Sequence, residues 1–163
     1  MSVSVIDATS TGSTGTVMVS GNMPAFSAYL NSGNQSISAT TWTKAALNAK
    51  EYDTASAFDN TTNYRFTPQV AGYYLLSAFS FINGSANPTY TRASIWKNGS
   101  EYKSTFLYGN GNTNGVATIT TLVYLNGSTD YIEMYLYISG GSSVYASNGA
   151  TNTYMSGVLV RAA

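Results

Sequence analysis

The sequence contains no cysteine and no histidine among its 163 residues. The missing cysteines exclude disulfides, thiolate nucleophiles and zinc–thiolate sites. Any catalysis would have to use carboxylates, lysine, tyrosine or serine, and the seven acidic residues show no spacing typical of a carboxylate pair. We therefore expect a protein that is not an enzyme, with no catalytic residue, no metal site and no cofactor.

Charge is also scarce. Only 9% of the residues are charged, against roughly 25% in an ordinary soluble domain, and seven basic residues balance seven acidic ones. The basic residues are scattered, so the chain lacks the basic patch that binds nucleic acid or an anionic membrane. No apolar run reaches the length of a membrane span, and residues 1–15 lack the basic and apolar regions of a secretory signal. We expect no nucleic-acid partner and no membrane insertion.

What the sequence has in abundance is β-forming residues. Hydrophobic residues make up 44% of the chain and include fourteen tyrosines, whose rings suit sheet surfaces and interfaces. Runs rich in Val, Ile, Thr, Tyr and Phe alternate with Asn-Gly pairs that favour tight turns. These pairs are Asn83-Gly84, Asn98-Gly99, Asn126-Gly127 and Asn148-Gly149. Only residues 43–50 have helix-forming composition, and they are too few to form a stable helix alone. The sequence predicts an all-β sandwich or barrel.

Two predicted strands are apolar on both faces. In residues 72–82 one parity carries Tyr74, Leu76, Ala78 and Ile82, and the other carries Tyr73, Leu75, Phe79 and Phe81. In residues 130–138 the even face carries Ile132, Met134, Leu136 and Ile138, and the odd face carries Tyr131, Glu133, Tyr135 and Tyr137. A strand with one solvated face should alternate apolar and polar residues. We therefore expect the aliphatic sets in the core and another copy of the chain over the second face. The predicted interface residues are Tyr73, Tyr131, Tyr135 and Tyr137.

Five segments occur in the order of a known family. They are residues 24–30 (PAFSAYL), 64–77 (YRFTPQVAGYYLLS), 95–99 (IWKNG), 122–137 (LVYLNGSTDYIEMYLY) and 154–160 (YMSGVLV). Together they resemble the globular head of complement C-one-q, a member of the tumour-necrosis-factor-like jelly-roll superfamily. Ser128 and Thr129 are inserted relative to the family pattern, and no collagen stalk precedes the head. No recognisable calcium site is present either.

The resemblance implies a ten-stranded antiparallel jelly-roll sandwich of two sheets that forms a homotrimer about a threefold axis. It covers residues 24–160, so we expect a jelly-roll domain over residues 24–163 and an extended arm over residues 1–23. The arm is rich in Ser, Thr and Gly and has no aromatic residue. Its apolar residues, which we expect to attach the domain to a partner, are Val3, Val5, Ile6, Val17 and Val19. The alternative is a frayed terminus.

Two further features are candidates for ligand contact. Residues 108–115 form the most loop-like segment within the domain, and its candidate contact residues are Tyr108, Asn110, Asn112 and Asn114. The alternative is a loop whose length is merely tolerated. Trp42 and Trp96 could stack on a sugar, although packing is the more common role of a tryptophan in a strand.

These features favour a structural protein of a tailed bacteriophage, by analogy with jelly rolls in phage particles. Capsid decoration, a head fibre and the head of a small tail fibre all fit a short trimeric β-domain with a polar arm. The expected partners are further copies of the chain and capsid or tail proteins. The expected location is the virion surface, and the extracellular medium after lysis. The alternative function is a receptor- or glycan-binding extracellular module such as an adhesin.

Overall fold

The structure is a computed structural model that describes residues 23–84, 88–109, 114–140 and 144–163. These residues form strands, turns and irregular segments, with no helix among them. The strands are β1 (Ala25–Tyr29), β2 (Gln35–Ile37), β3 (Thr43–Lys44), β4 (Ala49–Asp53), β5 (Phe58–Asp59), β6 (Arg65–Phe66), β7 (Gly72–Gly84), β8 (Tyr90–Lys97), β9 (Ser100–Tyr108), β10 (Gly115–Leu125), β11 (Ile132–Ser139), β12 (Val144–Ala146) and β13 (Thr153–Ala162).

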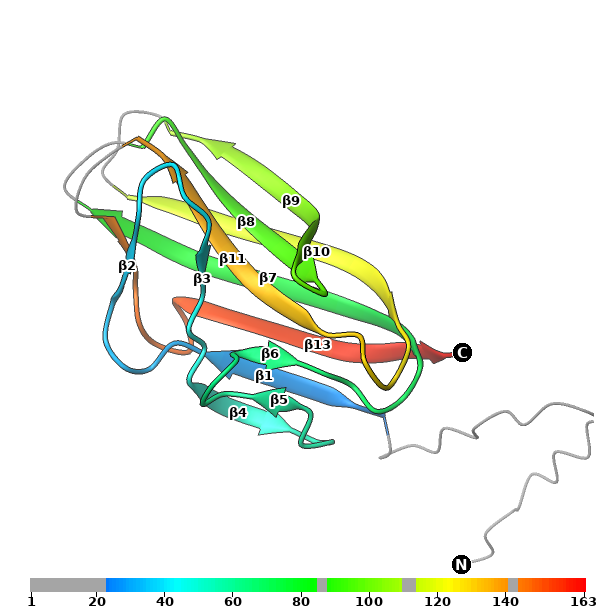
Figure 1. The fold of residues 1–163 in the computed structure, drawn as a ribbon. Coiled ribbons are helices and arrows are strands. Elements are labelled where there is room, and N and C mark those ends of the chain that lie inside the picture. The colour runs from blue at the N-terminus through cyan, green and yellow to red at the C-terminus, as the bar shows by residue number, and fades with distance from the viewer. Residues whose placement is uncertain (1–22, 85–87, 110–113, 141–143) are drawn as a thin grey trace, which may run out of the picture.

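The strands form two sheets that pack face to face (Figure 1). The seven-stranded sheet has the order β2-β12-β7-β13-β1-β4, with β10 also paired to β7. The six-stranded sheet has the order β5-β6-β11-β8-β9, with β3 also paired to β11. All strand pairs are antiparallel, as expected. The described residues contain thirteen strands rather than the expected ten, because β2, β3, β5, β6 and β12 are short pieces of two or three residues.

The core lies between the sheets and follows the predicted parity. Even positions of β7 and β11, such as Tyr74, Leu76, Met134 and Leu136, are almost fully buried. Near one end of the sandwich, the ring of Phe66 stacks at 4.3 Å on the ring of Phe26. The division of each long strand into a core face and an outer face is therefore confirmed, which defines the outer faces discussed below.

Three of the four predicted Asn-Gly turns are found between strands. Asn98 and Gly99 have φ angles of 53° and 79° and form the tight turn between β8 and β9. Gly127 must be glycine, because a Cβ there would lie 2.3 Å from the Ala71 backbone nitrogen. The turn predicted at Asn83-Gly84 is wrong. These residues extend β7 and pair with β12, so sheet pairing outweighs the local turn preference.

Both ends of the described chain lie at one end of the sandwich, which we call the basal end (Figure 1). At the opposite, apical end β9 ends and β10 begins. Within the described segments, no helix is long and apolar enough to cross a membrane.

Candidate functional site: the open face of the seven-stranded sheet

Large apolar side chains gather on the outer face of the seven-stranded sheet, which we call the open face. Near its basal end six of them are 37–47% exposed, and we call these six the basal patch. They are Tyr73 and Leu75 of β7, Leu122 and Tyr124 of β10, and Val158 and Val160 of β13. The register places Leu75 opposite both Leu122 and Val158, so the patch is continuous across three strands. An exposed, continuous apolar patch of this kind marks a surface that binds a partner.

Above the basal patch, a row of hydroxyl side chains crosses the open face. This hydroxyl row consists of Thr120, Ser77, Ser156 and Ser27, which are paired in that order from β10 to β1. Thr120 Oγ1 donates a hydrogen bond to Ser77 Oγ at 3.3 Å. At the other end of the row, Ser27 Oγ donates to Glu51 Oε2 on β4 at 2.7 Å. The open face is therefore layered, with a polar row above an apolar patch.

Two shallow hollows give the open face its relief. One has a volume of about 340 Å³ and is lined by Tyr73, Leu122, Val160 and Arg161 of the basal end. The other has a volume of about 250 Å³ and lies along the hydroxyl row, with Tyr52 on its rim. These hollows leave room for side chains of a partner, as interlocking interfaces require.

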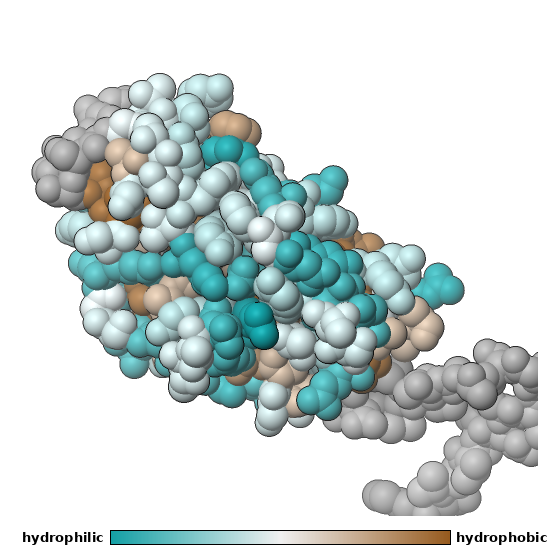
Figure 2. Space-filling view, viewed as in Figure 1, coloured by the Kyte–Doolittle hydropathy of each residue, from teal (hydrophilic) through white to brown (hydrophobic). Residues whose placement is uncertain are grey.

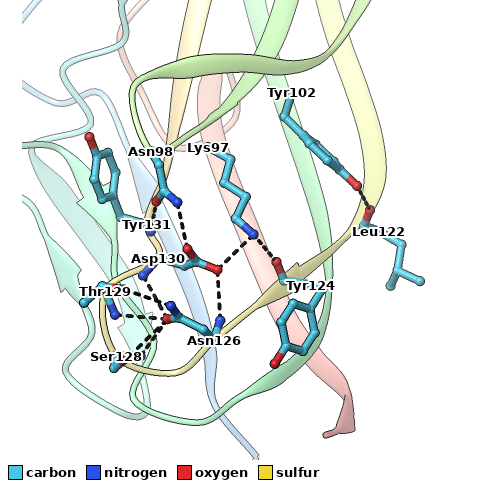
Figure 3. A network of polar contacts seen from close by, with 10 residues as sticks. All are labelled: Lys97, Asn98, Tyr102, Leu122, Tyr124, Asn126, Ser128, Thr129, Asp130 and Tyr131. Atoms are coloured by element: carbon cyan, nitrogen blue, oxygen red, sulfur yellow. Dashed lines mark hydrogen bonds and ion pairs between the residues drawn. The ribbon is translucent and has the colours of Figure 1, made fainter.

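The free edge of this sheet at β10 is closed to strand addition. Side chains from the other sheet donate hydrogen bonds to four carbonyl oxygens along it: Thr91 to Val116, Thr105 to Thr118, Tyr102 to Leu122, and Lys97 to Tyr124. The last two are drawn in Figure 3. Capping of this kind protects an edge strand from pairing with another chain. The edge at β10 is therefore unsuited to strand addition, and the outer face is the part of this sheet that stays open.

A polar network holds the basal end in place (Figure 3). Asp130 accepts hydrogen bonds from Lys97 Nζ at 2.9 Å, from Asn98 Nδ2 at 2.7 Å and from the Asn126 backbone N–H at 3.1 Å. The Lys97 hydrogen bond, with support from Asn98 and Asn126, lowers the pKa of Asp130. Because Lys97 also binds the Tyr124 carbonyl at 2.8 Å, the network fixes the position of β10 in the basal patch.

The outer face of the six-stranded sheet is organised differently, because the chain covers it itself. Trp42 precedes β3 and packs on Tyr137 and Trp96, with ring centroids 5.2 Å and 5.9 Å away. The Arg92 guanidinium lies 4.5 Å from the Trp42 ring, and Tyr135 stacks on Trp96 at 4.1 Å. The view of Figures 1 and 2 looks onto this side, which is mainly teal and pale with few brown areas.

The structure does not bring the four predicted interface tyrosines together. Tyr73 lies in the basal patch, whereas Tyr135 and Tyr137 lie on β11 of the other sheet and Tyr131 immediately precedes it. The Arg65 guanidinium lies 4.4 Å from the Tyr131 ring. The inference that another copy must cover β11 is corrected, since Trp42 and Trp96 of the same chain cover part of that face.

Sequence reasoning missed most of the basal patch. Leu122, Tyr124, Val158 and Val160 were not singled out, although residues 122–125 (LVYL) are apolar on both faces in the same way as residues 72–82. Buried Val123 and Leu125 alternate with exposed Leu122 and Tyr124, which is the available signal.

The predicted ligand-contact loop adjoins a cavity at the apical end. Tyr108 and Asn114 help to line this cavity of about 300 Å³, together with Phe81, Pro88 and Leu107. Its lining contains no charged residue. Asn110 and Asn112 lie outside the described residues, as do Val3, Val5, Ile6, Val17 and Val19 of the predicted arm. Trp42 and Trp96, considered as sugar platforms, pack mainly on other rings.

Acidic residues do not gather into a metal site in the part of the chain that the structure describes, where no group of three potential ligands is found. Asp59 illustrates the reason. Its carboxylate accepts hydrogen bonds from the backbone N–H groups of Thr61 and Thr62 and from Asn63 Nδ2. These bonds, the backbone ones above all, lower the pKa of Asp59. The side chain thereby stabilises the turn at residues 60–63.

Comparison with solved structures identifies the fold. The chain is similar to the globular domain of zebrafish complement 1qA protein, with a TM-score of 0.59, 17% identity and coverage of 86% of this chain and 99% of that one. It is also similar to Eiger TNF from S. frugiperda, with a TM-score of 0.65, 9% identity and coverage of 86% and 94%. For PRD1 vertex protein P5 the TM-score is 0.61, the identity 14% and the coverage 85% and 97%.

No protein-family model matches the sequence, and no curated protein matches it. The structural likeness, at identities of 9–17%, extends over nearly the whole length of each of these three proteins. The expected jelly-roll fold of the complement and tumour-necrosis-factor type is thereby confirmed.

Proposed function

We propose that the chain is a non-enzymatic structural protein of a virus particle and that it works as a homotrimer assembled through the open face. The basal patch is the observation that carries this proposal. Six large apolar side chains beside each other on one sheet, each more than a third exposed, are costly to leave in water. We assign a second copy of the chain to the basal patch. The reason is that the chain resembles a family in which the resemblance implies a trimer about a threefold axis.

The distribution of exposed apolar residues suits a ring. A cyclic trimer joins two different surfaces of the protomer, whereas a twofold dimer joins one surface to itself. Besides the basal patch, Tyr102, Phe106 and Leu107 on β9 are 39–53% exposed. β9 packs beside β10, so its exposed apolar side chains lie at an edge of the protomer that differs from the basal patch, and this edge is the region that we assign to the second neighbour.

Light scattering at micromolar concentration tests the trimer. We expect a mass three times that of one chain at this concentration, because obligate interfaces bury a large apolar area. A mass of one or two chains would overturn the trimer.

The placement on a particle rests on fold and composition. PRD1 vertex protein P5 shares the fold, and the chain combines few charges with many Ser, Thr and Asn residues on a small β-domain. A capsid decoration protein, a head fibre and a tail-fibre head of a tailed bacteriophage are the roles that fit. The protein would then lie on the virion surface, bound to capsid or tail proteins, and reach the extracellular medium after lysis.

Copy number on purified particles tests this role and separates its forms. We expect the chain to co-purify with intact particles at a fixed number that is a multiple of three. Many copies per particle, measured by gel densitometry, indicate decoration, and a few copies indicate a fibre. Particles without the chain would overturn the virion role.

The arm of residues 1–23 is the proposed attachment element. The chain enters the domain at its basal end, where Leu159 N–H donates to the Pro24 carbonyl at 2.9 Å and Thr54 Oγ1 donates to the Met23 carbonyl at 3.3 Å. Deletion of residues 2–20 should leave the far-ultraviolet spectrum, melting temperature and trimeric mass unchanged while abolishing binding to particles that lack the native copy. A truncated protein that unfolds, or that binds as well as the full chain, would contradict the role.

Receptor or glycan binding is a second candidate function, which the apical cavity favours. Tyr108 contacts the Tyr90 ring at 5.8 Å between centroids, yet it remains 72% exposed beside this uncharged cavity. Tyrosine rings and amides recognise neutral saccharides. Screening against immobilised neutral glycans, with Tyr108→Ala as the loss-of-binding variant, tests it. Signals equal for the parent protein and Tyr108→Ala would remove this candidate.

A further inference from the structure

Most charges in the described residues are neutralised within the chain. Four ion pairs join Lys44 to Glu133, Lys50 to Asp53, Arg92 to Glu101 and Lys97 to Asp130. Arg65 lies on the Tyr131 ring, and Asp59 accepts backbone hydrogen bonds. Within the described segments, Glu51, Lys103 and Arg161 likewise have no oppositely charged partner, and the Lys103 ammonium lies 5.6 Å from the centre of the Tyr102 ring.

Glu51 stands at one end of the hydroxyl row. It belongs to β4, the edge strand of the seven-stranded sheet, and its carboxylate lies over β1 through the 2.7 Å hydrogen bond from Ser27. Glu51 is exposed, so its charge is directed outward at the level of the row.

Lys103 stands at the same level at the other end of the row. It is an exposed residue of β9, the edge strand of the other sheet. Its neighbours fix its height, since Tyr102 binds the Leu122 carbonyl and Thr105 binds the Thr118 carbonyl of β10. Lys103 is therefore level with Thr120, the first member of the hydroxyl row.

Figure 1 shows β4 and β9 at opposite lateral ends of the sandwich. In a cyclic trimer one lateral end of each copy approaches the other lateral end of the next. Rotation about an axis that runs along the strands preserves height. From this we infer that Glu51 pairs with Lys103 of the neighbouring copy and that this pair, with the hydroxyl row, forms a polar layer that sets the docking height. The inference rests on the proposed trimer.

The polar layer gives the interface a defined height, which an apolar patch alone does not. The basal patch tolerates sliding because apolar contacts are not directional. A carboxylate covered by another copy without a cation is strongly disfavoured, so docking at any other height that covers Glu51 is penalised. Charged pairs across an interface act in this way on register and partner choice.

Charge reversal tests the pair, because the two residues come from different copies. We expect Glu51→Lys and Lys103→Glu each to raise the dissociation constant of the trimer at least tenfold, measured by sedimentation equilibrium in 50 mM salt. We expect the double variant Glu51→Lys/Lys103→Glu to return to within about threefold of the parent protein. Within the described residues Lys103 takes part in hydrogen bonding through its backbone carbonyl and not through its side chain, so Lys103→Glu removes no intrachain side-chain hydrogen bond there.

The matched control is Glu51→Lys/Arg161→Glu, which reverses a second cation that forms no ion pair within the described residues and should not restore assembly. Far-ultraviolet spectra of all variants should match that of the parent. Single variants with unchanged dissociation constants, or rescue by Arg161→Glu instead of Lys103→Glu, would overturn the pairing while leaving the trimer intact. A parent protein that is monomeric would instead overturn the proposed function.

Discussion

The outer faces of the two sheets differ in how much of their apolar surface the chain itself covers. Both carry apolar residues on their outer faces, yet the six-stranded sheet is covered by Trp42 from its own chain, whereas the seven-stranded sheet leaves the basal patch exposed. Around Trp42 the first face is therefore covered within one protomer. The second stays exposed in one protomer, which is the observation behind the proposed trimer.

Because of this difference, substitutions on the two outer faces should affect different properties: the stability of the single chain and the association of chains. Residues on the outer face of the six-stranded sheet should act on the folding of the single chain. Residues of the open face should act on the association of folded chains, since their exposed areas contribute little to the protomer. Four predictions follow the comparison from strong effects to weak ones.

Leu75→Asp should abolish the trimer. The carboxylate would lie at the centre of the basal patch, opposite the apolar side chains of Leu122 and Val158. Burial of an unpaired charge costs several kcal/mol, roughly enough to weaken association a thousandfold. Light scattering should give the mass of one chain, with an unchanged far-ultraviolet spectrum.

The control is Ser139→Asp, on the outer face of β11, which should remain trimeric. If Leu75→Asp stays trimeric or Ser139→Asp dissociates, the assignment of the two faces is reversed.

Trp42→Ala should destabilise the protomer and spare its assembly. The substitution removes ring contacts with Tyr137 and Trp96 and the cation–π contact with Arg92. Because Trp42 is half-buried, we expect a loss of about 2–3 kcal/mol, below the usual cost of removing a fully buried tryptophan. Urea unfolding measures it, and scattering before the transition should still show a trimer. A loss below about 0.5 kcal/mol would mean that Trp42 does not close this face.

Acid should weaken the basal end, where the two sheets are joined. The pKa of Asp130 is lowered in the folded chain, so its contribution to stability is present above the unfolded-state pKa and is lost as pH falls through the folded-state pKa. We expect the free energy of unfolding to drop below about pH 4. Asp130→Asn should cost about 1–3 kcal/mol at pH 7 and should show a smaller drop in acid. An equal acid response in both proteins would contradict this role.

Tyr102→Phe should have the smallest effect. The hydroxyl donates to the Leu122 carbonyl at 3.2 Å on a partly exposed edge, so its loss should cost about 0.5 kcal/mol. Thermal unfolding in parallel with Tyr29→Phe, whose hydroxyl makes no hydrogen bond within the described residues, provides the baseline. A loss of stability above about 2 kcal/mol would contradict this, because it would show that capping the β10 edge contributes more than one hydrogen bond of this length usually does.

The sequence predicted the fold better than the site. Alternation in residues 72–82 and 130–138 identified the core sets, and five family-like segments identified the jelly roll. The same alternation could not say which chain covers a second apolar face. For β11 the cover comes from Trp42, some ninety residues earlier, a tertiary contact that strand periodicity does not encode.

The open face was only partly predictable for a related reason. Tyr73 was identified because its own strand is apolar on both sides, but the basal patch exists only once β10 and β13 flank β7. The hydroxyl row likewise consists of ordinary serines and threonines until the register aligns Thr120, Ser77, Ser156 and Ser27. Strand order and register, rather than residue type, create these features.

Thiol labelling gives the most direct test of the claim that copies of the chain cover the open face. The chain has no cysteine, so Leu122→Cys and Tyr108→Cys each provide a single reporter, on the basal patch and at the apical end. At micromolar concentration we expect a maleimide to react with Leu122→Cys at least tenfold more slowly than with Tyr108→Cys, and the difference to vanish when Leu75→Asp is added. Equal labelling rates in the absence of Leu75→Asp would show that the open face is free in solution and would contradict the account.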